Sequence, residues 1–555
     1  MNTDYVSLGT AALRKLRQTT ARAWQIQKEQ LQTILQQNSL TENGLRYGFS
    51  QIRSTQEFQS RVPLSCHGDY EPYIENLLSG GTRQLTEEEP VYFAITSGST
   101  GTPKYVPVTG TDMLVHYDYI YGGVFGMVQE HYPQMPPEAL FGKIFQVGEF
   151  ARTSLPGGQM CGVRSASLYQ WLDRDGTFDA SDYCVPKEVL FPEKVEDLTY
   201  VKVRFALAER NITAIHSVFL HRVVGTLDYI RQNWDLLLRD MERGTVDDSI
   251  PLPEHWRQKV CQWLPPDPQR AAELRALQLD MNPEDMVLKI WPNIRYIVGI
   301  GGRNFPIYTR AMETYAKTVP IHHFIYGASE GFLSIAAGVG VPDAYILLPE
   351  AGFFEFLPVP HAAGHPLTME EVIPGNRYEL IFTNHSGLYR YRMQDVLEVV
   401  GFYGQSPIVR FCYRINQALN VADEKLNTEQ LREALRLFQQ RTGHEAACCA
   451  QEDYTVRPGR YLIYMEHIPL KDAEAVMDQC LCEASLGYQG CRSMGDIGPV
   501  RVRFLPPGSF QRYEQHLAHQ GRTMAQYKPI QILNSEESQR FFTAAADEFE
   551  ETREL

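Results

Sequence analysis

The sequence lacks the features that would place the chain in a membrane, outside the cell or on nucleic acid. No run approaches the roughly 18 apolar residues of a membrane span, and the first residues, MNTDYVSLGT, have no apolar signal core. Acidic residues outnumber basic ones, 67 Asp and Glu against 52 Lys and Arg, for a formal charge of −15. This balance argues against nonspecific binding of nucleic acid, which needs a basic surface.

Clustered cysteines are also lacking. The ten cysteines are scattered, and no two have CxxC spacing; the closest are the adjacent Cys448 and Cys449, and Cys480 with Cys482. We therefore expect neither a zinc site nor a disulfide framework. Free thiols are typical of a reducing compartment, so we expect a cytoplasmic protein.

The length and the pattern of the chain predict an α/β fold in two parts. A chain of 555 residues is too long for one core. Strands alternate with helices from residue 85 to 410, and the alternation starts again past residue 412. We expect a large N-terminal domain of β-sheets packed by helices (residues 1–411), a hinge (412–415) and a smaller mobile α/β domain (416–555). Residues 11–37 predict docked surface helices, and residues 212–239 predict a helix.

The most informative motif is the segment TSGSTGTPKY at positions 96–105. Apolar runs at 91–95 and 105–108 flank it and predict a strand on each side. Its glycines let backbone N–H groups approach phosphate oxygens, its hydroxyls donate hydrogen bonds, and Lys104 offsets negative charge. Pro103 precedes the lysine and a strand follows it, so this is no Walker motif. The segment predicts a site for a nucleoside triphosphate; the alternative is a hairpin turn at the surface.

Three further segments follow in order: YGASEG at 326–331, GLYRYRMQD at 387–395 and QYK at 526–528. Together with the loop they resemble the adenylate-forming superfamily, and more closely its Gretchen Hagen auxin-responsive branch of acyl-acid amido synthetases. The stretches LQTILQQNSLTENGLRYGF, FCYRINQALNVADEKLNTEQL and PPGSFQRYEQHLAHQGRTMAQYKP are similar to that family's N-terminal, hinge and C-terminal segments. The resemblance therefore covers nearly the whole chain.

The sequence departs from the plant pattern of that family in three places. The loop TSGSTGTPK and Gly327 are closer to the general superfamily form, and Gln394 stands where glycine is usual before Asp395. These differences indicate a bacterial or otherwise distant member. They do not change the expectation that the chain binds a nucleotide, but they leave the identity of its substrates open.

The resemblance implies a reaction in two steps. A carboxylate attacks the α-phosphate of ATP, which releases pyrophosphate and leaves an acyl-adenylate. An amine, in this family typically that of an amino acid, then attacks the acyl carbon and displaces AMP. Positioning and charge neutralisation supply most of such catalysis. The implied cofactors are ATP and Mg²⁺, and the implied partners are a small carboxylic acid and an amine, with no nucleic acid, no membrane and a monomeric chain.

The resemblance also implies a role for particular residues. Glu330 would bind Mg²⁺, and Asp395 would accept hydrogen bonds from both ribose hydroxyls. Lys528 and Lys425 would be the catalytic cations that rotation of the C-terminal domain brings to the nucleotide. The ATP and AMP contacts would come from Thr96, Ser97, Gly98, Ser99, Thr100, Gly101, Tyr326, Gly327, Ala328, Ser329, Glu330, Asp395, Phe411 and Arg414.

The acyl pocket implied by the resemblance lies between the predicted helix at 212–230, the loop at 299–302 and the strand before Tyr326. Its candidate residues are Phe219, Arg222, Val223, Gly301 and Gly302. An arginine there would pair a second carboxylate of the acid or the amine, although arginines on a helix surface are far commoner.

Most of these residues have a simpler structural interpretation. Glu330 taken alone is a solvated loop carboxylate, and Asp395 a salt-bridge partner of Arg390 or Arg392. Phe411, at the end of a strand, is typical of a core residue. Lys425 and Lys528 taken alone are surface cations.

Arginine and histidine residues near these motifs also have structural interpretations. Arg414 would either contact the ribose or anchor the hinge. The adjacent His322 and His323 lie on a predicted strand and face opposite sides, so they would not share a metal ion. His385 lies in a predicted turn, where a solvated side chain is expected.

Two other functions stay open from the sequence. An adenylate-forming enzyme can pass its acyl group to coenzyme A or to a carrier-protein pantetheine, which gives a thioester in place of an amide. A binding protein can keep an adenylate site without turnover, but the presence of Glu330, Asp395, Lys425 and Lys528 argues against that. The sequence does not name the acid or the amine.

Overall fold

The computed structural model describes most of the chain, in two compact units. The first unit contains Met1–Thr96, Lys104–Met393 and Glu398–Arg410, and the second contains Gln394–Leu397 and Phe411–Leu555. The described residues are 4–96, 104–148, 150–151, 153–193, 197–279, 282–301, 306–359, 365–415, 419, 421, 426–456, 459–466, 469–494, 497–520, 522, 527 and 529–554.

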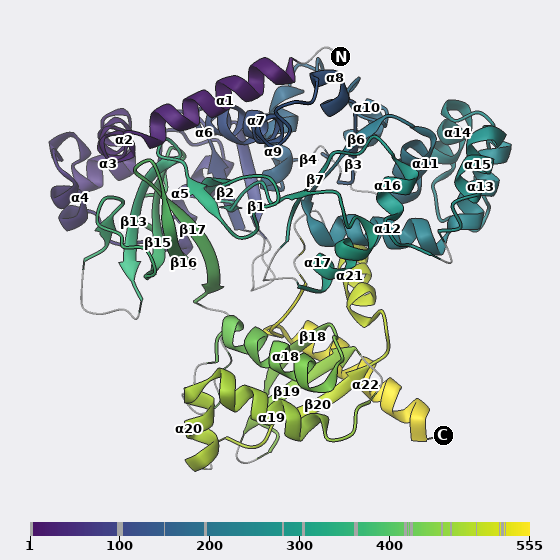
Figure 1. The fold of residues 1–555 in the computed structure, drawn as a ribbon. Coiled ribbons are helices and arrows are strands. Elements are labelled where there is room, and N and C mark those ends of the chain that lie inside the picture. The colour runs from purple at the N-terminus through teal and green to yellow at the C-terminus, as the bar shows by residue number, and fades with distance from the viewer. Residues whose placement is uncertain are drawn as a thin grey trace. The chain divides into compact units, whose positions relative to one another are not determined.

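Helices and strands alternate through the first unit (Figure 1). Its helices are α1 (Tyr5–Thr20), α2 (Ala23–Gln37), α3 (Glu42–Tyr47), η1 (Phe49–Gln51), α4 (Thr55–Arg61), η2 (His67–Asp69), α5 (Glu71–Leu78), α6 (Gly110–Val115), the π-helix η3 (His116–Tyr121), α7 (Gly122–His131), α8 (Pro137–Leu140), α9 (Arg164–Leu172), α10 (Lys187–Leu190), α11 (Thr199–Ala208), α12 (Leu220–Gln232), α13 (Trp234–Arg243), α14 (Glu254–Trp263), α15 (Pro268–Arg275), α16 (Met286–Ile290) and α17 (Pro306–Tyr315). Its strands are β1 (Tyr92–Thr96), β2 (Lys104–Val108), β3 (Lys143–Gln146), β4 (Thr153–Ser154), β5 (Met160–Gly162), β6 (Ile212–Phe219), β7 (Tyr296–Ile300), β8 (Ile321–His322), β9 (Gly327–Ala328), β10 (Gly331–Phe332), β11 (Ser334–Ala336), β12 (Tyr345–Leu347), β13 (Gly352–Pro358), β14 (Leu367–Thr368) and β15 (Arg377–Asn384), followed by β16 (Tyr391–Tyr403) and β17 (Ser406–Arg414).

The N-terminal helix α1 packs closely against α7. The Asp4 carboxylate caps α1 by accepting a hydrogen bond from the N–H of Ser7 at 2.9 Å. A β-carbon added at Gly9 would lie 2.5 Å from the backbone nitrogen of Gly126, so the two helices approach at a distance that only glycine permits. Leu16 on the packed face is buried. The structure therefore confirms docked N-terminal helices.

The described strands of the first unit form three larger sheets. Their strand orders are β2-β1-β5-β4, β3-β6-β7-β8 and β11-β12-β17-β16-β15-β13-β14. All pairs in the second of these sheets are parallel, and α12 lies against β6 and β7. Parallel sheets with helices on their faces define an α/β fold, which confirms the predicted class.

Residues 212–239 correct the sequence prediction of a single helix. They form strand β6, then α12 and the first part of α13. The segment ITAIHSVF lies between two parallel neighbours and is buried along almost its whole length. A strand buried on both faces shows an apolar run without alternation, which is why its period resembled that of a helix.

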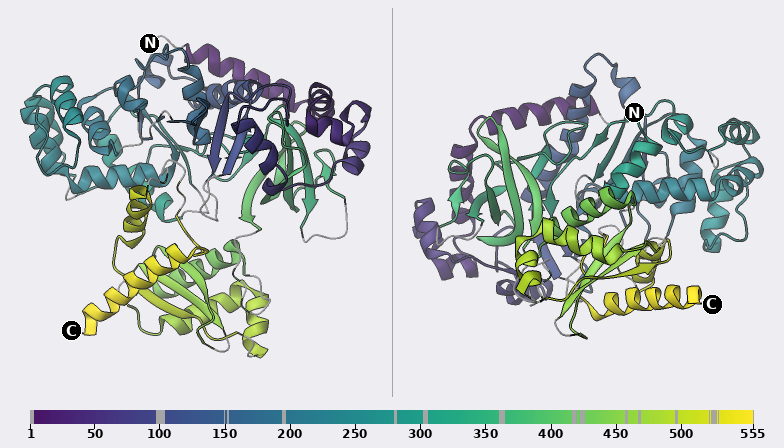
Figure 2. Two further views of the ribbon diagram at one scale, coloured as in Figure 1. Left: turned by 180° about the vertical axis from the view of Figure 1, so that it is seen from behind. Right: turned by 60° about the horizontal axis from the view of Figure 1, so that its bottom comes forward.

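The second unit is a small α/β layer structure. Strand β19 (Arg460–Glu466) lies between β18 (Cys448–Asp453), which is antiparallel to it, and β20 (Arg501–Leu505), which is parallel to it. Ile463 packs in a core with α18 (Thr428–Thr442), α19 (Ala473–Ala484) and α20 (Leu486–Met494), and its neighbour Tyr464 packs in another core with α21 (Ser509–His519) and α22 (Glu536–Glu554). Because neighbouring strand residues face opposite sides, helices cover both faces of this sheet (Figure 2).

Helix α18 begins at Thr428 and is capped by Asn427. The Asn427 side chain accepts a hydrogen bond from the N–H of Gln430, and the Gln430 side chain accepts one from the N–H of Asn427. This reciprocal capping box satisfies two backbone donors that helix formation leaves without partners. No helix in the described ranges is both long and apolar enough to cross a membrane.

The buried histidines of the first unit predict that it loses stability in acid. Burial lowers the pKa of His216 and of His322 to about 3. The folded state therefore holds both rings neutral, and its stability is complete above the unfolded pKa of about 6.5 and falls as the pH drops below it. We expect the free energy of unfolding to fall by about 1.4 kcal/mol per pH unit for each ring.

The measurement is the melting temperature between pH 7 and pH 5. The His322→Gln variant is expected to show a shallower fall than the parent chain, whereas His365→Gln, at an exposed position, should keep the parent's slope. Equal slopes for the parent and His322→Gln would contradict the prediction.

Candidate nucleotide-binding site

The predicted phosphate loop connects two paired strands. β1 and β2 are antiparallel, and Thr96 pairs with Lys104 at the end where the loop leaves β1 and enters β2. Both flanking strands are therefore confirmed. Of the loop candidates, Ser97, Gly98, Ser99, Thr100 and Gly101 lie outside the described residues, as do Gly302, Lys425 and Lys528.

The second motif folds into a tight β-hairpin. β9 and β10 pair antiparallel, with Gly331 opposite Ala328 and Phe332 opposite Gly327, so Ser329 and Glu330 form a two-residue turn. A β-carbon at Gly331 would lie 3.0 Å from the ring of Phe382, which leaves little room for a side chain there. The hairpin thus holds Glu330 at a defined point of the first unit.

The base of the hairpin is fixed by a single hydroxyl. Ser334 Oγ accepts a hydrogen bond from the N–H of Tyr326 at 2.9 Å and donates one to the carbonyl of Tyr326 at 2.8 Å. Glu330 is 9% exposed as a whole residue, so most of it is enclosed by the surrounding chain. No described residue forms an ion pair or a hydrogen bond with its carboxylate. A lone half-enclosed carboxylate of this kind suits a hard cation such as Mg²⁺.

The turn after β15 supports this hairpin. The sequence did not indicate this support. Asn384 Nδ2 donates to the carbonyl of Glu330 at 2.7 Å, while Asn384 Oδ1 accepts from the N–H groups of Ser386 and Leu388. The expected solvated His385 is wrong: it is buried, and its Nε2 lies 2.9 Å from the carbonyl oxygen of Glu350. A polar turn is normally exposed, so only the fold reveals that this one is inside.

In the third motif, the predicted alternative partners of Asp395 pair elsewhere. Arg390 Nη2 lies 2.9 Å from the Glu355 carboxylate, and Arg392 Nη2 lies 2.7 Å from that of Glu379. Asp395 is 5% exposed and faces Arg414, whose Nη1 is 3.5 Å from its Oδ1. Of the two interpretations of Arg414, this ion pair fits an anchoring role.

Gln394 adopts a backbone conformation that favours glycine. Its φ is +59°, and its carbonyl accepts a hydrogen bond from the N–H of Ile415 at 2.8 Å. The left-handed region costs a side chain with a β-carbon about 1–2 kcal/mol. The positive φ therefore gives a physical reason why glycine is usual at this position. This chain keeps the positive φ although it has glutamine there.

The remaining candidates lie in well-packed surroundings. Phe219 ends β6 and is buried, and Val223 on α12 is also buried, while Arg222 and Phe411 are half-buried. A β-carbon at Gly301 would lie 2.8 Å from the side chain of Leu220, so the backbone is closely covered there.

The histidine pair forms no metal site among the described residues. His322 lies in β8 opposite Val298 of β7, and both His322 and His323 are buried. No group of three or more His, Cys, Asp or Glu side chains in the described ranges is arranged to hold a metal ion. None of the ten cysteines, all of which lie in the described ranges, forms a disulfide.

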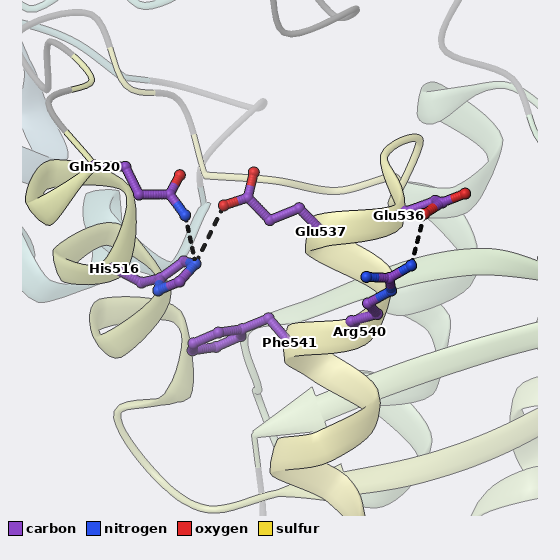
Figure 3. A pocket seen from close by; sticks show the side chains of 6 residues that line it. All are labelled: His516, Gln520, Glu536, Glu537, Arg540 and Phe541. Atoms are coloured by element: carbon purple, nitrogen blue, oxygen red, sulfur yellow. Dashed lines mark hydrogen bonds and ion pairs between the residues drawn. The ribbon is translucent and has the colours of Figure 1, made fainter.

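A hollow of about 560 Å³ lies in the second unit, between α21 and α22 (Figure 3). Glu537 of α22 connects to His516 of α21, because its carboxylate lies 3.1 Å from His516 Nε2. The same carboxylate lies 2.7 Å from Arg522 Nη2. Its lining residues are His516, Gln520, Glu536, Glu537, Arg540 and Phe541. None of the predicted site residues that the structure describes lines this hollow.

Comparison with solved structures identifies the fold. The structure is similar to the acyl acid amido synthetase AtGH3.15 in complex with 2,4-DB, with a TM-score of 0.84 at 24% identity over 98% of this chain and 97% of that one. It is similar more distantly to a 2-hydroxyisobutyryl-CoA ligase in the postadenylation state, with a TM-score of 0.50 at 13% identity over 94% and 91% of the two chains. The chain has the fold of the adenylate-forming enzymes.

Three family models then cover most of the chain in order. They are the GH3 family N-terminal domain at residues 12–321, the GH3 family central domain at 345–414 and the GH3 family C-terminal domain at 429–537. The chain belongs to the GH3 family, which is the one its motifs resemble.

Named relatives align along almost their whole length. The jasmonoyl–L-amino acid synthetase GH3.5 of Oryza sativa subsp. japonica is 27% identical over 95% of this chain and 97% of its own. The indole-3-acetic acid-amido synthetase GH3.10 of Arabidopsis thaliana is 26% identical over 95% and 96%.

The strained backbone at Gln394 gives a prediction that separates the backbone from the side chain. We expect Gln394→Gly to be more stable than Gln394→Ala by about 1 kcal/mol, because both variants lose the same side-chain contacts and only the alanine keeps the β-carbon at positive φ. Urea denaturation of the two variants measures the difference. An alanine variant as stable as the glycine variant would contradict the strain.

Proposed function

We propose that the chain is an ATP-dependent acyl acid amido synthetase. It joins the carboxyl group of a small acid to an amine through an acyl-adenylate and releases pyrophosphate and then AMP. The observation that carries the proposal is the ordered match of all three GH3 domain models along the chain. The names of the aligned relatives support amide formation and an amino acid as the amine.

The acid-activating step needs an anion to attack an anion, so charge must be neutralised around the phosphates. We assign this to the loop residues Thr96, Ser97, Gly98, Ser99, Thr100 and Gly101, whose N–H and hydroxyl groups donate to phosphate oxygens. Mg²⁺, when bound with ATP, supplies further positive charge on the phosphates. Glu330 is the residue that would hold it, because it is a largely enclosed residue whose carboxylate has no cationic partner among the described residues.

The nucleoside is assigned to the hairpin and to the third motif. Tyr326, Gly327, Ala328 and Ser329 lie along the hairpin that carries Glu330 and would line the adenine and the α-phosphate. The Asp395 carboxylate would accept hydrogen bonds from both ribose hydroxyls, and Arg414, with Nη1 3.5 Å from Oδ1, would orient it. Phe411 is assigned to the base.

The two lysines are assigned to the reacting phosphate. Lys528 stabilises the charge that develops on the α-phosphate during adenylation, and Lys425 reaches the nucleotide in a rotated state of the C-terminal domain. We divide the chain for this purpose into an adenylation domain (1–411), a hinge (412–415) and a mobile domain (416–555). We also propose that the enzyme acts as a monomer in the cytoplasm, on small molecules only.

The acid is assigned to a pocket beside strands β6 and β7. Phe219 and Val223 would supply apolar surface and Arg222 charge, and Gly301 and Gly302 would leave the acid room to approach the α-phosphate because they carry no side chain. The relatives act on jasmonate and on indole-3-acetic acid by name, and we propose a carboxylic acid of comparable size for this chain.

The test is a screen of carboxylic acids with ATP for pyrophosphate release, followed by mass spectrometry with either an amino acid or coenzyme A present. The proposal expects an acid-dependent release of pyrophosphate and an amide product. A thioester product would overturn the amide step, and no pyrophosphate with any acid would overturn adenylation itself.

The role of Lys528 gives a prediction within this screen. Lys528→Ala is expected to lower acyl-adenylate formation about 100-fold or more, because it removes a charge contact made in the transition state. The matched control is Lys471→Ala, an exposed lysine in the same part of the chain, which should keep the parent rate. Unchanged pyrophosphate release in Lys528→Ala would remove Lys528 from the mechanism.

A further inference from the structure

We propose that Phe332, Arg164 and His116 are positioning residues that fix the hairpin carrying Glu330, and that they thereby set the affinity of the enzyme for a divalent cation with ATP. The inference rests on the proposed role of Glu330. It adds three residues, from three separate segments, that no motif in the sequence singled out.

The contacts centre on the ring of Phe332. This residue lies in β10, two positions after Glu330, and pairs with Gly327 across the hairpin. The ring of His116 lies 3.8 Å from that of Phe332, between centroids, and the guanidinium carbon of Arg164 lies 4.6 Å from the same centroid. Phe332 is 8% exposed, so the aromatic and cation–π contacts act where water does not weaken them.

Arg164 is itself held in place by several partners. Its guanidinium forms a buried ion pair with Asp112 and donates a hydrogen bond to Ser167 Oγ at 2.5 Å. Its side chain is 2% exposed, and burial lowers its pKa while Asp112 opposes that shift. An arginine so enclosed cannot follow Phe332 if the ring moves, so it defines where the ring sits.

His116 completes the contact from the π-helix η3. Burial lowers the pKa of His116 well below its usual value, and the neighbouring charge of Arg164 lowers it further, so the ring that packs on Phe332 is neutral. A π-helix is an uncommon turn that often marks a functional position. Here it places an imidazole against the strand that follows Glu330.

A second set of hydrogen bonds joins α6, the helix that carries Asp112, to the tip of the hairpin. Thr109 caps α6 by accepting from the N–H of Asp112, and the N–H of Thr109 donates to Ser386 Oγ at 3.1 Å. The N–H of Ser386 donates to Asn384, which donates to the carbonyl of Glu330. Asp112 is therefore linked to the hairpin by two routes, one through Arg164 and Phe332 and one through the backbone of Glu330.

This closed set of contacts matters because Mg²⁺ demands near-ideal geometry. Its oxygen ligands lie at about 2.0–2.1 Å, so a carboxylate on a loose turn would bind it poorly. Residues that orient a metal ligand typically change metal affinity about 10- to 100-fold when they are lost. We expect the loss of the Phe332 ring to act in that range.

The experiment measures binding of Mn²⁺ with ATP by electron paramagnetic resonance, which needs no turnover. Phe332→Leu is expected to weaken Mn²⁺·ATP binding about 10-fold, while binding of ATP in EDTA stays within about twofold of the parent. Phe332→Tyr keeps the ring and should keep the affinity. Asp112→Asn combined with Arg164→Met removes the ion pair without leaving a buried charge and should weaken binding as Phe332→Leu does.

Two further variants separate the possible causes. Phe58→Leu removes another buried ring of the first unit, one that packs on Phe353, and should leave binding unchanged. Glu330→Gln should weaken Mn²⁺·ATP binding at least as much as Phe332→Leu. If Glu330→Gln has no effect, the proposed metal ligand is wrong and the inference falls with it. If Glu330→Gln weakens binding but Phe332→Leu behaves like Phe58→Leu, only the positioning role is overturned.

Discussion

The buried ion pair between Arg390 and Glu355 is the interaction on which the core of the first unit depends. Both carboxylate oxygens of Glu355 accept from Arg390, whose Nη1 also donates to the carbonyls of Gln59 and Val62 at 2.8 and 2.7 Å. One guanidinium thus joins a helix near the N-terminus, strand β13 and the start of β16. Removal of either partner would leave a charge without compensation, at a cost of about 3–5 kcal/mol.

The neighbouring backbone follows from this pair. The N–H of Ser65 donates to the carbonyl of Arg390, and the carbonyl of Ser65 accepts from the N–H of Arg392, so residues 59–65 run beside the strand that leads to Asp395. Arg390 takes a φ of +49° to direct its side chain inward. The strain at this residue and at Gln394 lies on either side of one short segment, and strained backbone of this kind is typical of functional sites. Arg390 of the third motif therefore has a structural role, and the ligand role that we propose in this motif belongs to Asp395.

The sequence predicted much of this molecule because its signals were local. The two strands that flank the phosphate loop, the α/β class and the helices of residues 11–37 all followed from periodicity and turn residues. The family followed from motifs in a fixed order. The error at residues 212–239 had a physical cause, since a strand buried on both faces carries no alternation that would separate it from a buried helix.

The parts of the site that the sequence did not reveal are all long-range. Asn384 meets Glu330 across 54 positions, and Arg164 meets Asp112 across 52, so no spacing rule connects them. A buried arginine and a surface arginine look alike in a sequence, because burial is decided by partners that only folding brings together. The same holds for His385, where a polar turn became an interior one. Motifs thus identify the groups that would touch a ligand, whereas the residues that hold those groups in place must be read from the fold.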